Sequence, residues 1–115
     1  MKSPLLIAII FFISFQQDDV LKYLNEEIKN IEIKGILISK KSVNSEYIFI
    51  VKDNATGEEK SIELKDEIHN SKNIYKFISP GDHFIKIAGE LKVRLGHKVD
   101  NNIEVKHFQL LPKNE

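Results

Sequence analysis

The sequence predicts a mainly β fold, namely a small five-stranded barrel of the oligonucleotide/oligosaccharide-binding type (OB-like), with an open antiparallel sheet and a packed helix as the alternative. Apolar and polar residues alternate with a period of two over much of the chain after Asn30, which is the pattern of half-buried strands. Two of these runs contain an internal glycine that can bend a strand. A short stretch between the third and fourth runs breaks the alternation, and we expect a helix there.

The composition limits the size and the class of the protein. The chain has 115 residues and a mass of 13.3 kDa, which suits one small domain after a short N-terminal segment. Its 17 basic and 17 acidic side chains balance, so the basic excess typical of nucleic-acid-binding proteins is missing. The absence of cysteine excludes disulfides, a thiolate metal site and a cysteine nucleophile.

Residues 1–16 have the layout of a secretory signal peptide. Lys2 precedes an unbroken apolar run over 4–13, and a polar stretch begins at Gln16. The run is shorter than the about 20 apolar residues that a helix needs to cross a bilayer. We therefore expect a cleaved signal peptide over 1–16 and a single β-rich domain over 17–115 that has no transmembrane span and is periplasmic or secreted.

The domain is expected to begin with a short helix over 18–29, in which apolar residues such as Leu24 and Ile28 share one face. The first strand follows over 31–38. The apolar phase of this strand changes at Gly35, which predicts a bulge or a sharp bend at that glycine.

The most regular hairpin joins strands over 47–51 and 60–64. The intervening stretch 53–57 ends in Gly57, and its residue types are those of a turn. The strand over 47–51 is apolar on both faces, which indicates a central position in the sheet.

The stretch 66–78 predicts a helix that covers one end of the β structure, and Pro80 prevents it from continuing. A fourth strand is expected over 84–95 with a bend at Gly89, and a fifth over 103–110. The total is five strands with a helix between the third and the fourth.

The segment Tyr75-Lys76-Phe77-Ile78-Ser79-Pro80-Gly81-Asp82, continued by Lys86 and by Gly89-Glu90-Leu91-Lys92-Val93, resembles a recurrent segment of small uncharacterised exported proteins of Bacteroidota-type bacteria. In that group an aromatic-rich turn of helix leads into Gly-Asp and then into a bent strand with lysine. The resemblance implies a secreted or periplasmic β-rich domain, and it implies no particular activity.

No residue pattern indicates catalysis, a metal or a cofactor. The histidines at 69, 83, 97 and 107 lack the spacing of a helical ligand pair. Asp82 at a barrel mouth can act in acid–base chemistry, but its position in a turn favours hydrogen bonds to nearby amides. We expect no catalytic residue, no metal ligand and no cofactor, with a small hydrolase that uses Asp82 or a histidine kept as an alternative.

One candidate ligand-binding surface combines aromatic rings with lysines. Tyr47 and Phe49 share a face of the central strand, and on an OB-like barrel such rings can stack on bases or sugars. With Lys34 and Lys92 beside them they form a surface suited to a sugar or a peptide. The same spacing also fits core residues, and the small core of the domain favours that interpretation.

These observations predict a non-catalytic binding or accessory module of the periplasm or cell surface, whose partner is an envelope protein or a glycan. An OB-like oligonucleotide- or oligosaccharide-binding module is the alternative. The charge balance and the single arginine, Arg94, disfavour nucleic acid as the ligand. The sequence predicts no oligomeric state.

Overall fold

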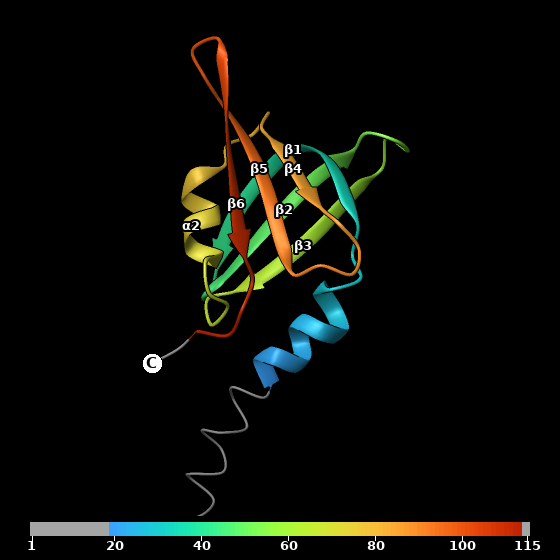
Figure 1. The fold of residues 1–115 in the computed structure, drawn as a ribbon, viewed down its shortest axis with the longest axis vertical. Helices are drawn as coiled ribbons and strands as arrows, with labels where there is room; N and C mark the ends of the chain where they lie inside the picture. The colour runs from blue at the N-terminus through green and yellow to red at the C-terminus, as the bar shows by residue number, and fades with distance from the viewer. Residues whose placement is uncertain (1–18, 114–115) are drawn as a thin grey trace, which may run out of the picture.

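The computed structural model describes residues 19–113, so the signal-peptide prediction for 1–16 lies outside the described residues. The described chain forms a single antiparallel sheet with two helical segments (Figure 1). The elements in chain order are η1 (Leu24–Ile28), β1 (Ile33–Val43), β2 (Glu46–Asp53), β3 (Glu59–Lys65), α2 (Ser71–Phe77), β4 (His83–Lys86), β5 (Lys92–Val99) and β6 (Asn102–Gln109).

The sheet is open, and its strand order is β3-β2-β1-β4-β5-β6. The mainly β class and the helix between the third and fourth strands are confirmed, but the prediction of a closed five-stranded barrel is wrong. A barrel with this order closes by pairing β3 with β5, and here β6 occupies the free edge of β5 along its whole length. The alternative, an open sheet with a packed helix, is the observed architecture.

The sheet has six strands because the predicted fourth strand over 84–95 is two strands. The chain reverses between β4 and β5 at Gly89, whose φ of +90° suits glycine. The Gly89 N–H donates to the Lys29 carbonyl at 2.8 Å, which ties this turn to the end of the N-terminal helix. A glycine inside an alternating run therefore marks a reversal here instead of a bend.

β1 connects the two halves of the sheet. Gly35 lies opposite Asp53 of β2 and also opposite Phe84 of β4. A Cβ at this position would lie 1.9 Å from the Lys52 carbonyl oxygen, so only glycine fits. The predicted irregularity exists, but the register shift lies between Leu37 and Ser39, after the glycine.

The hairpin of β2 and β3 has the predicted turn. The Asp53 carboxylate accepts hydrogen bonds from the backbone N–H groups of Thr56 and Ala55 at 3.1 and 2.9 Å. These bonds, that of Thr56 first, lower the pKa of Asp53. The turn of β1 and β2 uses Asn44 and Ser45, both with positive φ, as a two-residue hairpin turn requires.

The core fills the concave face of the coiled sheet, which we call the inner face. Phe49 and Phe84 from the two halves of the sheet meet there with ring centroids 5.8 Å apart. Both helical segments contribute to this core, since Leu24 and Ile28 from η1 and Ile74 from α2 are fully enclosed. No helix within residues 19–113 has the length and apolar content to cross a membrane.

The helix predicted over 18–29 is confirmed from residue 19 to 28, and a buried lysine fixes its C-terminal end. Lys86 of β4 has no solvent exposure. Its ammonium donates to the carbonyls of Lys29, Ile31 and Ile87 at 2.8, 3.1 and 2.9 Å. Lys86 therefore connects the N-terminal helix, β1 and β4 from inside the core.

Candidate functional site

The residues of the predicted ligand surface lie on opposite faces of the sheet. Tyr47 and Phe49 point into the core, with relative exposures of 8% and 0%. Lys34 and Lys92 are exposed on the opposite face, which we call the outer face. The surface of two rings flanked by two lysines is therefore not formed, because alternate residues of a strand point to opposite sides.

Tyr47 is held in the core by specific contacts. Its hydroxyl donates to Asp66 Oδ1 at 3.0 Å, and its ring lies 5.2 Å from that of Tyr75 on α2. Burial is the main cause that raises the pKa of Tyr47 above its usual range. The ring is a core residue with a satisfied polar end.

The two lysines instead border an apolar and cationic region of the outer face. Across the strands, Lys34 neighbours Ile85, Ile85 neighbours Arg94, and Arg94 neighbours His107. The adjoining row runs from Ile36 through His83 and Gly96 to Val105. Residues that are far apart in the sequence thus form one continuous surface over β1, β4, β5 and β6.

Two adjacent hollows lie in this region, and we call them together the Arg94 hollow. The first has a volume of about 310 Å³ and is lined by His83, Ile85, Arg94, Gly96, Ile103 and Val105. The second has a volume of about 280 Å³ and is lined by Ile85, Ile87, Glu90, Lys92, Arg94 and His107. Ile85 and Arg94 line both, so the two hollows share a wall.

The Arg94 hollow combines exposed apolar side chains with cations. Ile87, Ile103 and Val105 are 45%, 56% and 44% exposed. Arg94 forms no ion pair with any residue in the range 19–113. Its guanidinium therefore remains available to a carboxylate, for which its planar set of donors is suited.

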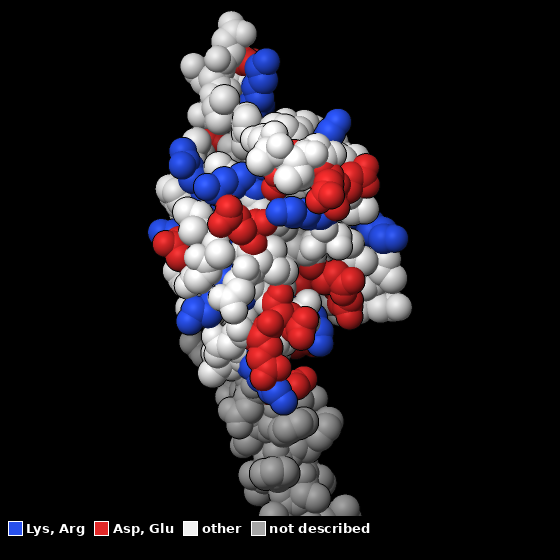
Figure 2. Space-filling view, turned by 90° about the vertical axis from the view of Figure 1, so that its right-hand side faces the viewer, with Lys and Arg blue, Asp and Glu red and all other residues white. Residues whose placement is uncertain are grey.

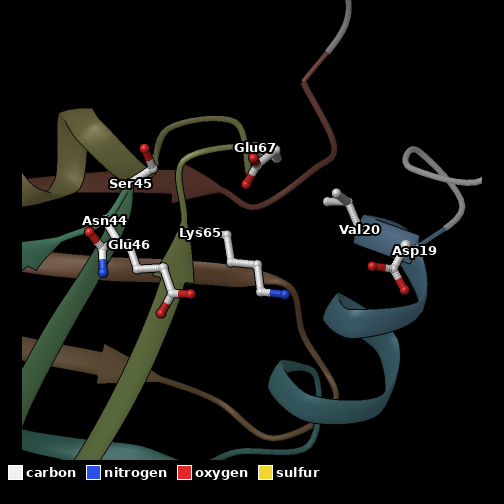
Figure 3. Close-up of a pocket in the computed structure, with 7 residues that line it drawn as sticks. All are labelled: Asp19, Val20, Asn44, Ser45, Glu46, Lys65 and Glu67. Carbon is white, nitrogen blue, oxygen red and sulfur yellow. The ribbon is translucent and has the colours of Figure 1, made fainter. Parts of the chain in front are cut away.

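A third hollow, of about 330 Å³, lies between the N-terminal helix and the sheet (Figure 3). Asp19 and Val20 line it from the helix, and Lys65 of β3 extends toward the gap between helix and sheet. Its other lining residues come from the β1–β2 turn with the start of β2 and from the β3–α2 connection, namely Asn44, Ser45, Glu46 and Glu67. The side chains come from opposite walls and do not converge on one point (Figure 3).

Asp82 pairs with a histidine, a feature that the sequence analysis did not predict. His97 Nδ1 lies 2.6 Å from Asp82 Oδ2, and the Ser79 N–H donates to the same oxygen at 2.7 Å. The His97 ring packs edge-on against Phe77 of α2. The contact of His97 with Asp82 therefore joins the 79–82 turn to β5.

Across residues 19–113, no three His, Asp or Glu side chains gather in a way that could hold a metal ion. On the face shown in Figure 2, basic and acidic side chains are interspersed, without a large area of one sign. Comparisons with protein-family models, with curated proteins and with solved structures found no match.

The residues of the Arg94 hollow were missed because the sequence alone does not decide which set of alternating residues in a strand faces the core. Ile85 of β4 and Ile87, the residue after it, alternate with Phe84 and Lys86, and the isoleucines are the obvious core candidates. The structure places Phe84 and Lys86 inside and the isoleucines outside. The only available signal was the isolated arginine, Arg94, within a lysine-rich sequence.

Proposed function

We propose that this chain is a non-catalytic binding module of the periplasm or cell surface, and that it holds a protein partner in the Arg94 hollow. The observation that carries the proposal is the exposure of Ile87, Ile103 and Val105 beside an arginine without an ion pair among the described residues. Exposed apolar side chains with a polar rim are typical of protein-binding surfaces, and arginine is enriched in them.

A protein partner is favoured over a glycan by the placement of the aromatic residues. Sugar recognition by stacking needs an exposed ring, and the rings proposed for it, Tyr47 and Phe49, are buried. The described outer face of β4, β5 and β6 carries no Phe or Tyr side chain, since Phe84 and Phe108 alternate to the inner side. The apolar lining and the guanidinium suit an acidic peptide segment with aliphatic side chains.

Export is part of the proposal and rests on the pattern of residues 1–16. The test is intact-mass analysis of the protein from the envelope fraction of its native host. We expect the loss of about 16 N-terminal residues, as for a cleaved signal peptide. Full-length chain found in the cytosol contradicts export.

The binding site is tested with the purified chain as bait in an extract of the same envelope. We expect one stoichiometric partner that is lost with Arg94→Glu or Ile87→Ser. It should be retained with Lys72→Glu, a charge reversal at an exposed position of α2. Equal recovery by all variants refutes the Arg94 hollow as the site. Salt-sensitive retention on single-stranded DNA instead supports the nucleic-acid alternative.

A further inference from the structure

β6 is an edge strand, and part of its outward side has no partner within the described chain. The Leu110 N–H donates to the Leu91 carbonyl at 2.8 Å, and bonding in an antiparallel pair alternates from residue to residue. The even-numbered residues of β6 therefore bond to β5. The backbone groups of Ile103, Val105 and His107 point away from β5, toward the edge.

The neighbouring stretch of the same edge is already covered. The Gln109 carbonyl accepts a bond from the Asn70 side chain at 2.9 Å, and the Leu111 carbonyl accepts one from the His69 N–H at 2.6 Å. At the other edge of the sheet, the Glu63 carbonyl of β3 accepts a bond from the Tyr23 hydroxyl. The uncovered part of the β6 edge is therefore the stretch 103–107.

This uncovered stretch lies beside the part of the hairpin that projects from the molecule. The turn end of β5 and β6 extends beyond the other strands as a two-stranded ribbon (Figure 1). An approaching strand can therefore reach the edge, and exposed edges of this kind recruit further strands.

We propose that two copies of the chain pair through β6 in antiparallel orientation, with a two-fold axis at Val105. In this register Val105 faces Val105 of the second copy, and Ile103 faces His107 of the second copy. Each such pair exchanges two backbone hydrogen bonds, so all three uncovered residues are satisfied. A slide by two residues in either direction pairs Val105 with Ile103 or with His107 of the second copy. It then places Glu104 opposite Glu104, or Lys106 opposite Lys106, and like charges directly opposite are destabilising.

The side chains in this register are complementary in charge. Glu104 lies opposite Lys106 of the second copy, and the symmetry repeats the pair on the other side of the axis. Opposite charges directly across two antiparallel strands are stabilising. The stretch 103–107 is thus self-complementary, as an interface with two-fold symmetry requires.

The pairing also accounts for the exposure of Ile103, the most exposed large apolar side chain within residues 19–113. Ile103 is 56% exposed and Val105 is 44% exposed, and both side chains lie on the outer face beside the Arg94 hollow. In the dimer they pack across the axis, and the outer faces of the two copies become one surface. An interface of one short strand is below about 1,200 Å², so the dimer is expected to be weak and dependent on concentration.

For the experiment, the chain is produced with its own N-terminal segment and purified. Sedimentation equilibrium then measures its mass over a series of concentrations. Val105→Pro removes an outward N–H and leaves the ladder to β5 intact, since proline is tolerated on an edge. The matched control is Ser61→Pro on β3, the other edge strand. The bond from the Asp66 N–H to the Ser45 carbonyl shows that the even-numbered residues of β3 bond to β2, so the N–H of Ser61 points outward as that of Val105 does. We expect a monomer–dimer equilibrium that Val105→Pro abolishes and Ser61→Pro preserves.

A charge exchange tests the register even if the proline variant fails to fold. Lys106→Glu places like charges across the axis and should weaken the dimer at least tenfold. The double variant Glu104→Lys/Lys106→Glu restores opposite charges and should restore the dimer. Any of four results overturns the proposal: a monomer at every concentration, a dimer unaffected by Val105→Pro, loss of the dimer in Ser61→Pro, or no rescue in the double variant. The proposed dimer does not depend on the partner proposed for the Arg94 hollow.

Discussion

Lys86 uses all the donors of its ammonium within the core. Its three hydrogen bonds reach carbonyls of the N-terminal helix end, of the segment that leads into β1 and of the residue after β4. No carboxylate bonds to it among the described residues, and burial lowers its pKa below the usual 10.5. The side chain therefore connects three segments at the cost of burying a cation.

Replacing Lys86 with methionine, which has a similar length and no donor, should lower the free energy of unfolding by about 2–4 kcal/mol, since three carbonyls lose a charged donor. Chemical denaturation at neutral pH measures this change. The control is Lys92→Met at an exposed position of β5, which should change stability by less than about 0.5 kcal/mol. Equal effects of the two substitutions contradict the role assigned to Lys86.

The lowered pKa of Lys86 also predicts a dependence of stability on pH. Between its pKa in the folded chain and the usual 10.5, the unfolded chain binds more protons than the folded chain. The free energy of unfolding contributed by Lys86 therefore rises as the pH rises through this window. The stability difference between the native chain and Lys86→Met, measured at several pH values, should widen toward pH 10.5. A difference that narrows contradicts the sign.

Truncation of Phe49 and truncation of Tyr47 should lower the free energy of unfolding by different amounts. Phe49→Ala empties a site between Phe84 and Tyr75 and should cost about 3–5 kcal/mol, as large core deletions do. Tyr47→Phe removes only the bond to Asp66 and should cost about 0.5–1.5 kcal/mol. Urea titration of both variants measures these values. A nearly neutral Phe49→Ala shows an exposed ring and refutes the burial described here.

At the scale of elements, β1 depends on the absence of a side chain at Gly35. Gly35→Ala places a Cβ against the Lys52 carbonyl and should destabilise the chain by more than about 2 kcal/mol, because backbone atoms must move. Gly89→Ala is the matched control. The space around Gly89 is open, so only its positive φ is penalised, at about 1 kcal/mol. Thermal unfolding of the two variants should show the larger decrease for Gly35→Ala.

The sequence predicted elements better than it predicted faces. The hairpin of β2 and β3 follows from a regular alternation around a turn with Gly57, and both strands and the helix α2 occur where expected. In β2 and β4 the residues on both sides of the strand are apolar or nearly so, and alternation cannot show which side faces the core. In β4 a lysine occupies the inner side because carbonyls of distant segments satisfy it, and such contacts leave no local pattern.

The candidate site was not predictable for the same reason. Arg94, Ile85 and Val105 come together only through the order of β4, β5 and β6, which the alternation of each strand does not contain. The number of strands was also decided by a single residue. Gly89 fits a bend and a reversal equally well in sequence, and the bond from its N–H to Lys29 selects the reversal.

For the molecule as a whole, one core shared by both halves of the sheet predicts a single cooperative unfolding transition. The chain has no tryptophan and three tyrosines, and Tyr23, Tyr47 and Tyr75 report on the N-terminal helix, β2 and α2. Tyrosine fluorescence and far-ultraviolet circular dichroism should give the same midpoint in urea. Two separate midpoints contradict a shared core.

The strand order also determines how the chain reaches this structure. β1 pairs with β2, its neighbour in the chain, and also with β4, which follows three further elements. Closing the long loop from Ile33 to Lys86 costs more chain entropy than forming the local hairpins, so the meander of β1, β2 and β3 is expected to form before β4 docks. Substitutions in β2 and β3 should then slow folding, whereas those in β5 and β6 should mainly accelerate unfolding.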